Sequence, residues 1–530
     1  MKSIKYFLPI VLFAFVITSC SKKLDLSPTN DLTASNVYNT SLGYKQALAK
    51  VYGSMATTGN KGATGNADIP SQIISDEGNS DFLRLLWDLQ CISTDEAGWT
   101  YFGNTDPVGI HQMKWSSVNQ TVSGLYYRCF FQITLCNDFI NQSSDANLSS
   151  RGISGKSADS IRAYRAEARF LRAYQYSILM DLFGNPPFVT EASAIGSGIP
   201  PQIKRDSLFR YIETELKAIE PLLVAPKANE YGRADRAADW ALLARIYLNA
   251  KVYTGTTRFT DAITYANKVI SSGYTLHPNY NELMLADNNL NTDEFILTIP
   301  YDGTNTQNYG GTTTLVHGPA GVPASISGSN GSWNCIRVTQ QFVSLFSNSD
   351  PRGQFWTTGQ LLNMDTLLGA PGNGYSSIKF RNVTRTGAPA PHADPKGDFS
   401  DIDFPIFRLA EVYLIYAEAV LRGGVGGDAK TALEYVNTLR KRGFGSEAGK
   451  ITADQLNTDF ILDERGRELF WECFRRTDLI RYGKFTTSDY LWAWKGGVQT
   501  GTSVGSYLNL FPIPSTDLSA NPNLKQNIGY

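Results

Sequence analysis

Residue spacing typical of helices recurs at separate places along this chain. Between residues 163 and 183, Phe170, Ala173, Tyr174 and Ser177 stand at positions i, i+3, i+4 and i+7, which form one face of an α-helix. A Gly-Asn-Pro-Pro segment follows directly and stops the helix. Arg and Ala, which are strong helix formers, are frequent in this segment. It therefore predicts a long helix with one face toward a partner.

The same spacing reappears with different residues in a pair of helices predicted at 237–250 and 259–270. The first helix carries it on Trp240, Leu243, Ala244 and Tyr247. A small residue among large ones lets two antiparallel helices approach closely, as in tetratricopeptide repeats. A third pair is predicted at 407–421 and 429–440, on either side of a Gly-rich turn. The repeats are degenerate and widely separated, so they do not form a regular solenoid.

Long loop-like segments separate these pairs. Residues 290–332 are rich in Gly, Asn and Thr, with one strand-like run at 294–299, and residues 360–395 are similar. Loops of such length are uncommon in a compact protein and usually carry function. We expect a mainly α fold, a tetratricopeptide-like scaffold of helical pairs with long loop insertions and a few short β-hairpins. The functional site is expected on the loops.

The first twenty residues have the plan of a bacterial lipoprotein signal. Two lysines precede an apolar run at 7–17, and small residues stand directly before Cys20. The run is too short and wrongly flanked for a membrane-spanning helix. An acylated Cys20 would anchor the chain without spanning the membrane. We expect a signal peptide at 1–19, a lipidated tether at 20–40 and a single domain at 41–530.

Composition excludes several classes of function. Removing residues 1–19 takes away two lysines and no acid, which leaves 46 basic against 49 acidic residues. No positive patch stands out, so nucleic acid is not an expected partner. The cysteines after Cys20 are odd in number and scattered, without a CxxC pair, and the four histidines have no metal-ligand or triad spacing. We expect no cofactor, and the sequence leaves a structural calcium ion open.

Several short segments, in the same order along the chain, resemble the SusD/RagB family of Bacteroidetes surface lipoproteins. They are Leu24–Pro28 (LDLSP), Ala166–Ala173 (AEARFLRA), Leu182–Pro187 (LFGNPP), Gly232–Asp235 (GRAD), Phe407–Leu414 (FRLAEVYL), Glu464–Leu469 (ERGREL) and Phe511–Pro514 (FPIP). The resemblance covers essentially the whole mature chain. It implies a lipid-anchored, cell-surface location on the outer membrane, a sugar-binding face built from loops, and no catalysis. It also implies a partner, a SusC-like TonB-dependent transporter of the outer membrane.

The resemblance extends to the starch-binding site of the family, where two tryptophans and a tyrosine form an arc around the glycan. Tyr101 stands at the position of the first ring, with Trp99 two residues earlier as an alternative, and segments around Tyr309 and Trp333 resemble those that carry the other two. The polar ligands of that site fall on Asp76, Arg84 and Asn104. This chain has Tyr101 where a tryptophan is expected, which keeps a ring but reduces its area.

These residue types suit a sugar because a pyranose has apolar C–H faces and a rim of hydroxyl groups. Aromatic rings are large and stiff, and ring contacts contribute about 0.5–1.5 kcal/mol beyond area burial. Asp76 only accepts hydrogen bonds and Arg84 donates through a fixed fork, so together they can address neighbouring hydroxyls. The sequence therefore predicts binding of an α-glucan, most simply starch, while dextran and other α-glucans stay open.

Two other functions compete with glycan binding. Asp95 and Glu96 are the candidate carboxylates of a glycoside hydrolase, although neighbours in sequence rarely straddle a scissile bond. The second alternative is a lid or adaptor whose surface rings touch only the transporter. The charged segment 463–476 resembles an active site at first, but we expect a single helix there whose charges pair at i, i+3 and i, i+4.

Overall fold

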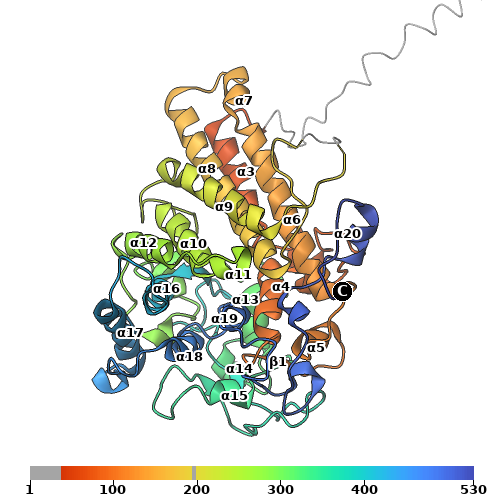
Figure 1. Ribbon diagram of the computed structural model, residues 1–530. Helices are drawn as coiled ribbons and strands as arrows, with labels where there is room; N and C mark the ends of the chain where they lie inside the picture. The colour runs from red at the N-terminus through yellow and green to blue at the C-terminus, as the bar shows by residue number, and fades with distance from the viewer. Residues whose placement is uncertain (1–36, 194–197) are drawn as a thin grey trace, which may run out of the picture.

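The computed structural model describes residues 37–193 and 198–530. The predicted signal peptide, the lipidation site Cys20 and most of the predicted tether lie outside the described residues. Within them, helices dominate and the strands are short (Figure 1), so the predicted mainly α class is confirmed. Among the described helices, none combines the length and the apolar character that crossing a membrane requires.

Four long helices form one end of the molecule (Figure 1). They are α3 (Ser41–Gly53), α6 (Gln120–Gln142), α8 (Gly155–Leu182) and α9 (Arg205–Ile219). Helix α8 packs against α6 and α9, and α3 packs on both α6 and α8. The helix predicted from the spacing at 163–183 is the second half of α8, and it ends one residue before Phe183, ahead of Gly184 with φ of 73°.

A second group of packed helices confirms the two predicted helical pairs. Helix α10 (Arg236–Leu248) is followed by α11 (Ala250–Thr254) and packs on α12 (Phe259–Ile270). Helix α12 packs in turn on α16 (Leu409–Leu421), which packs on α17 (Ala429–Phe444). The alanines of these helices that are fully buried include Ala241, Ala244, Ala262, Ala266 and Ala417. Side chains this small allow the close antiparallel approach seen in tetratricopeptide pairs.

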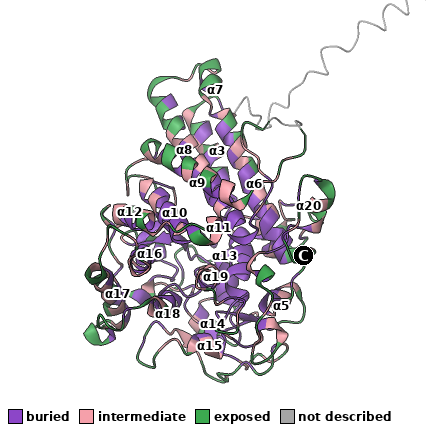
Figure 2. Cartoon of the chain, in the orientation of Figure 1, coloured by how far each residue is buried: buried purple, intermediate pink, exposed green. Residues whose placement is uncertain are grey.

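The remaining helices are shorter. They are α4 (Phe82–Trp87), α5 (Asp106–His111), α7 (Asp145–Ser150), α13 (Gly311–His317), α14 (Ala324–Ser327), α15 (Gln340–Val343), α18 (Thr458–Glu468), α19 (Arg475–Arg481) and α20 (Ser515–Ala520). Figure 2 shows that exposed residues gather on the outer loops and at the α7 tip, whereas the facing sides of the long helices are buried. The core therefore runs through the helix contacts and continues beneath the loops.

The prediction of a single helix at 463–476 is wrong. Helix α18 ends at Glu468, and α19 begins only at Arg475. Between them Trp471 and Cys473 have positive φ values of 62° and 68°, a left-handed conformation that interrupts a helix. Trp471 is fully buried, and its indole N–H donates to the Glu96 carbonyl at 3.0 Å. Tertiary packing of this tryptophan outweighs the local helical preference of its neighbours.

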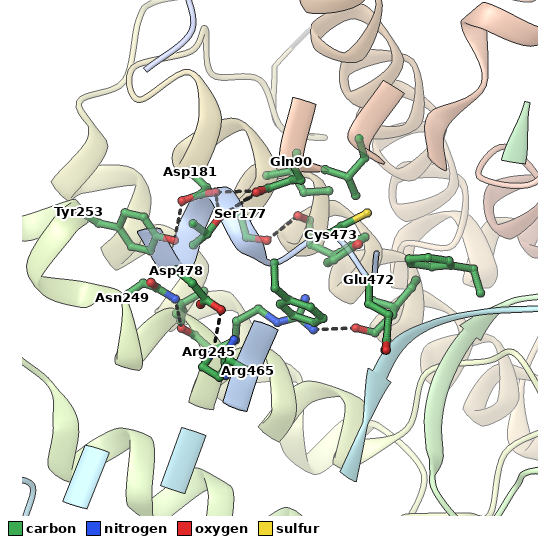
Figure 3. A pocket seen from close by; sticks show the side chains of 18 residues that line it. Gln90, Ser177, Asp181, Arg245, Asn249, Tyr253, Arg465, Glu472, Cys473 and Asp478 are labelled. Carbon is green, nitrogen blue, oxygen red and sulfur yellow. Dashed lines mark hydrogen bonds and ion pairs between the residues drawn. The ribbon is translucent and has the colours of Figure 1, made fainter. Parts of the chain in front are cut away.

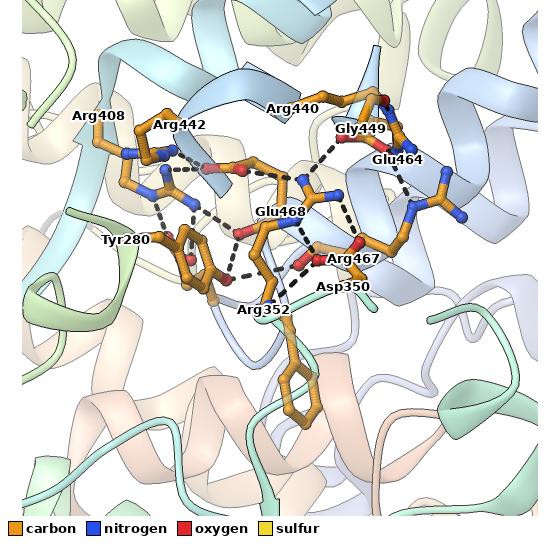
Figure 4. A network of polar contacts seen from close by, with 12 residues as sticks. Tyr280, Asp350, Arg352, Arg408, Arg440, Arg442, Gly449, Glu464, Arg467 and Glu468 are labelled. Carbon is orange, nitrogen blue, oxygen red and sulfur yellow. Dashed lines mark hydrogen bonds and ion pairs between the residues drawn. The ribbon is translucent and has the colours of Figure 1, made fainter. Parts of the chain in front are cut away.

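The charges of this segment also pair differently from the prediction. Figure 4 shows Glu468 near the centre of a network of polar contacts that also includes Glu464. Both side chains are fully buried. Glu464 accepts from Arg352 and Arg440 at 2.7 Å each, and Glu468 accepts from Arg408 at 2.7 Å. Only the contact of Glu464 with Arg467 has the predicted i, i+3 spacing. The network joins helices to loops that are far apart in the sequence.

In the part of the chain that the structure describes, the strands form three antiparallel pairs. Strand β1 (Gly98–Trp99) pairs with β3 (Ile336–Arg337), and β2 (Phe295–Ile299) pairs with β6 (Phe404–Arg408). Strands β4 (Phe355–Trp356) and β5 (Ser376–Ser377) are neighbours along the chain, whereas the other two pairs join distant segments. The strand-like run at 294–299 is confirmed as β2, and residues 407 and 408, predicted as helical, belong to β6. The β1–β3 pair brings the loop after residue 99 next to the loop before residue 336.

Candidate functional site

Arg84 and Tyr309 are brought together although 225 residues separate them. Arg84, buried at the start of α4, donates from Nη1 to the Tyr309 carbonyl at 3.3 Å. Gly311 N donates to Asp81 Oδ1 at 2.8 Å, which holds the same two segments together. A Cβ atom on Gly78 would lie 2.6 Å from the Tyr309 Cβ, so only glycine fits this approach. The segment of residues 78–84 thus holds the backbone of Tyr309 in place.

The acidic pair beside this contact divides into an exposed and a buried carboxylate. Asp76 is exposed and accepts from Asn79 N at 2.7 Å through one oxygen. Glu77 is buried, and it accepts from the Thr58 hydroxyl and from Tyr309 N, the latter at 3.3 Å. Burial raises the pKa of Glu77. Sequence reasoning selected Asp76 and missed Glu77, whose role is to hold the backbone that carries the Tyr309 ring.

Tyr309 and Trp333 form an angled pair of rings. Their centroids lie 6.4 Å apart with 58° between the planes. Tyr309 is 40% exposed and Trp333 is half-buried, so both rings reach the surface. Phe399 supports the tyrosine from below, with its centroid 5.1 Å from that of Tyr309. Two surface rings at this angle present apolar faces that point in different directions.

His317 supports the second ring and was missed by sequence reasoning. Its imidazole stacks on the Trp333 indole at 4.9 Å between centroids and 16° between planes. Trp333 N donates to the His317 carbonyl at 2.6 Å, and the His317 Nδ1 lies 2.7 Å from the Gly331 carbonyl. Burial lowers the pKa of His317, so the ring is neutral at pH 7 and donates from Nδ1. No local sequence signal marks a histidine for stacking.

The third predicted ring lies on the loop that leaves β1. Thr100 N donates to the Cys335 carbonyl at 2.8 Å, and Thr100 Oγ1 donates to the Asn334 carbonyl at 3.2 Å. These bonds attach the residue before Tyr101 to the residues just after Trp333. Tyr101 is 53% exposed. Asn104 follows on the same loop, partly exposed, and its Oδ1 accepts from Asp106 N at 3.3 Å.

Trp99 is not available to a ligand. It is 2% exposed, and its indole N–H donates to the Tyr101 carbonyl at 3.1 Å. A ring buried in this way offers no face to a sugar. The prediction that Trp99 could contact the glycan is therefore wrong. The two rings differ because the strand that holds Trp99 is paired with β3, whereas Tyr101 lies beyond the last pair. Trp99 instead supports the loop that carries Tyr101.

The candidate glycosidase carboxylates lie inside the protein. Asp95 is fully buried and binds Arg475 through two hydrogen bonds of 2.9 and 2.8 Å. Glu96 is 1% exposed, and burial raises its pKa to about 8. Neither carboxylate lies at the surface formed by the exposed rings. Their positions fit a structural role in anchoring α19 to the segment before β1.

A cavity of about 80 Å³ lies apart from the rings, between α8, α10 and α19. Figure 3 shows Asp181 at its edge, where it accepts from Tyr253 at 2.9 Å, Thr477 at 2.6 Å and Gln90 at 3.2 Å. Since a water needs about 10–15 Å³ measured in this way, the cavity has room for a few waters. Within residues 37–193 and 198–530, no group of three or more His, Cys, Asp or Glu side chains is placed to hold a metal ion.

Comparison with known proteins identifies the family. A profile of the SusD family matches residues 357–530. The chain is 36% identical to the starch-binding protein SusD of Bacteroides thetaiotaomicron, over 97% of this chain and 96% of that protein. It is 26% identical to the SusD-like protein P25 of Formosa agariphila, over 73% of this chain and 77% of that protein. The chain belongs to the SusD family.

Solved structures agree with the fold. The surface glycan-binding protein A of Bacteroides thetaiotaomicron, in complex with laminarihexaose, aligns with a TM-score of 0.70 over 91% of this chain and 98% of that chain. The sequence identity is 21%, so this likeness concerns the fold alone. A second structure of surface glycan-binding protein A from the same organism aligns with a TM-score of 0.72 at 21% identity, over 93% of this chain and 100% of that chain.

Proposed function

We propose that this protein binds an α-glucan at a surface formed by Tyr101, Tyr309 and Trp333. The observation that carries the proposal is the angle of 58° between the Tyr309 and Trp333 rings. A flat sugar polymer would meet only one ring at that angle, whereas a chain that curves can lay successive pyranose faces on both. The relative named as starch-binding, 36% identical over nearly the full length, supports an α-glucan as the ligand.

Polar groups at the edge of the rings would supply selectivity. Asp76 is exposed, Arg84 is anchored beside Tyr309, and Asn104 follows Tyr101 on its loop. A polar site group left without a partner by the wrong sugar costs about 1–3 kcal/mol, which equals or exceeds the contribution of about 0.5–1.5 kcal/mol from one ring contact. The rings thus give general affinity for sugar faces, and the hydrogen bonds distinguish between sugars.

We further propose that the protein acts as a binding subunit without catalysis. In this proposal a lipid on Cys20 anchors it to the outer membrane at the cell surface, and it delivers glycan to a SusC-like TonB-dependent transporter. The related proteins are named for binding, and the only acidic pair that suggested hydrolysis is buried against Arg475. Weak contacts suit such a role, because repeated sites on one polymer raise the effective concentration.

Affinity electrophoresis of the soluble protein in gels with amylose, dextran or laminarin tests the proposal. Amylose should retard the wild type most, and Trp333→Ala or Tyr309→Ala should each weaken binding about 2- to 10-fold. Tyr507→Ala is the matched control, since this ring is 43% exposed on the C-terminal segment. Prolonged incubation should release no reducing ends.

Two results would contradict the proposal. New reducing ends that disappear in Asp95→Ala or Glu96→Ala would establish a hydrolase. If Tyr101→Ala, Tyr309→Ala and Trp333→Ala together left retention unchanged but abolished co-purification with the transporter, the rings would belong to an adaptor surface.

A further inference from the structure

A fourth ring lies at the surface next to the proposed site. Phe102 directly follows Tyr101 and is 64% exposed, more than any of the three proposed contact rings. Leaving a phenyl group in water forgoes about 1.5–3 kcal/mol that burial would supply. Contiguous exposed apolar side chains, here the adjacent rings of Tyr101 and Phe102, are typical of sites that a ligand or partner covers. Phe102 therefore needs an explanation that the three-ring site does not give.

The Phe102 ring rests on backbone. A Cβ atom on Gly369 would lie 2.4 Å from a carbon at the edge of the phenyl ring, so only a glycine fits beneath it. Gly369 also has a φ of 70°, in the left-handed region that glycine adopts without strain. The edge of the ring is thus held against the backbone while the side chain stays exposed. A ring held in this way loses little conformational freedom when a ligand covers one of its faces.

Hydrogen bonds make the support continuous with the proposed site. Gly369 N donates to the Thr100 carbonyl at 3.1 Å, and Thr100 N donates to the Cys335 carbonyl at 2.8 Å. The loop around residue 369 and the loop around Trp333 are therefore both hydrogen-bonded to Thr100, the residue that directly follows β1. Met364, fully buried, lies against Gly98 and anchors the first loop at a second point.

A second connection closes the arrangement. Gln360 Nε2 donates to the Ala320 carbonyl at 2.7 Å, and Gly321 N donates to Asn334 Oδ1 at 2.8 Å. The loop of residues 360–374 is thereby joined through Gln360 to the segment that binds Asn334, next to Trp333, and through Gly369 to Thr100, next to Tyr101. Leu361 and Leu362 are also exposed on this loop, next to the exposed polar residues Asn363, Asp365 and Thr366. The loop that holds the Phe102 ring thus presents both apolar and polar side chains to the surface.

We infer that Phe102, supported by Gly369, is an outer subsite that stacks on a sugar of the same glucan chain beyond the sugars held by Tyr101, Tyr309 and Trp333. This inference rests on the proposed function. A polymer that leaves the central rings must pass over their surroundings, and a fixed ring next to Tyr101 offers another apolar platform for a pyranose face. The subsite would make affinity depend on chain length.

Isothermal titration with maltotriose and with a long maltooligosaccharide tests this inference. Phe102→Ala should leave the Kd for maltotriose unchanged and raise the Kd for the long chain about 2- to 10-fold. Phe102→Trp should restore tight binding of the long chain, because it keeps a ring. Gly369→Ala should reproduce the Phe102→Ala phenotype by displacing the phenyl group. Leu290→Ala is the matched control, since Leu290 is 63% exposed elsewhere.

The outcomes separate this inference from the proposed function. If Phe102→Ala matched the wild type at both lengths while Trp333→Ala weakened both, the outer subsite would be overturned and the central site would stand. An equal loss at both lengths would also overturn it, by placing Phe102 in the central site. A wild type that bound neither sugar would overturn both proposals. Sedimentation that showed dimers lost in Phe102→Ala would assign the ring to contact with a second copy and overturn the subsite.

Discussion

Two neighbouring acids of this protein are equally buried but differ in their partners. Asp95 and Glu96 are adjacent and both buried, yet only Asp95 has a guanidinium bound to both its oxygens. Glu96 accepts from Trp471 N at 3.4 Å, and its other oxygen is buried without a partner among the described residues. Burial disfavours the charged form by more than the nearby Arg475 and the hydrogen bonds of Glu96 offset, which is why the pKa of Glu96 is raised to about 8.

Replacement of Glu96 by glutamine should stabilise the protein at neutral pH. In the folded state the raised pKa keeps Glu96 protonated up to about pH 8, whereas the unfolded chain loses that proton above its ordinary pKa of 4.5. The unfolded state therefore binds fewer protons, and this group lowers the free energy of unfolding as pH rises from about 5 to 8. Glu96→Gln removes the effect and should add about 1–3 kcal/mol at pH 7.

Urea denaturation at pH 5 and pH 7.5 measures this difference. The advantage of Glu96→Gln should be larger at pH 7.5. Glu434→Gln is the control, because Glu434 is exposed and should show no such trend. An advantage of equal size at both pH values, or a loss of stability at pH 7.5, would disagree with a neutral buried Glu96.

Helices and strands of this fold are held together by buried ions as well as by apolar contacts. Arg408, at the end of β6, donates to Glu294 at 2.8 Å, to Glu468 at 2.7 Å and to Glu472 at 2.6 Å. It thereby connects a strand with the residue before β2, the end of α18 and the segment before α19. All four side chains are almost fully buried. Buried charges of this kind depend on every partner being present.

Arg408→Met should destabilise the protein strongly although it preserves volume. It leaves three buried carboxylates without their shared cation, and breaking a buried pair from one side costs about 3–5 kcal/mol. Thermal unfolding followed by circular dichroism measures the change. Arg162→Met is the control, because Arg162 binds Asp145 and Asp159 at the exposed surface. Similar transition temperatures for Arg408→Met and the control would show that the network adds little to stability.

At the scale of the whole molecule, buried ion pairs and buried neutral acids make opposite contributions to pH dependence. Arginines hold the pKa of Glu468 and of Glu418 at about 2 each, far below the usual 4.5. Their stabilisation is complete above the unfolded pKa and is lost as pH falls from about 4.5 to 2. Two buried acids have raised pKa values, about 8 for Glu96 and about 7 for Asp403. Because such acids keep their protons in the folded state, the free energy of unfolding rises as the pH falls toward 5.

The free energy of unfolding should therefore be greatest near pH 5 and fall steeply below pH 4. Urea denaturation followed by tryptophan fluorescence, from pH 2 to 8 at constant ionic strength, measures this profile. In Glu418→Gln the fall below pH 4 should be shallower, because one of the titrating pairs is gone. A stability that stays constant from pH 5 to pH 3 would contradict the assigned ion pairs.

The sequence by itself determined the helices whose signals are local. The helix at 259–270 matches its prediction at both ends, and the pairs around it follow from small and large residues at helical spacing. The exposed rings Tyr101 and Tyr309 and the half-buried Trp333 were also selected from the sequence, because segments with recognisable family patterns carry them. Such information survives in short stretches of chain, so no knowledge of distant residues is needed to read it.

Only the tertiary structure decided which side chains are covered. Trp99 and Tyr101 have similar local sequence, but pairing of β1 with a strand more than two hundred residues away buries the first and leaves the second exposed. The same holds for Glu77 and His317, which support rings, and for the break at Trp471. Burial depends on neighbours that are distant in the chain, and a local sequence pattern does not indicate which residues these are.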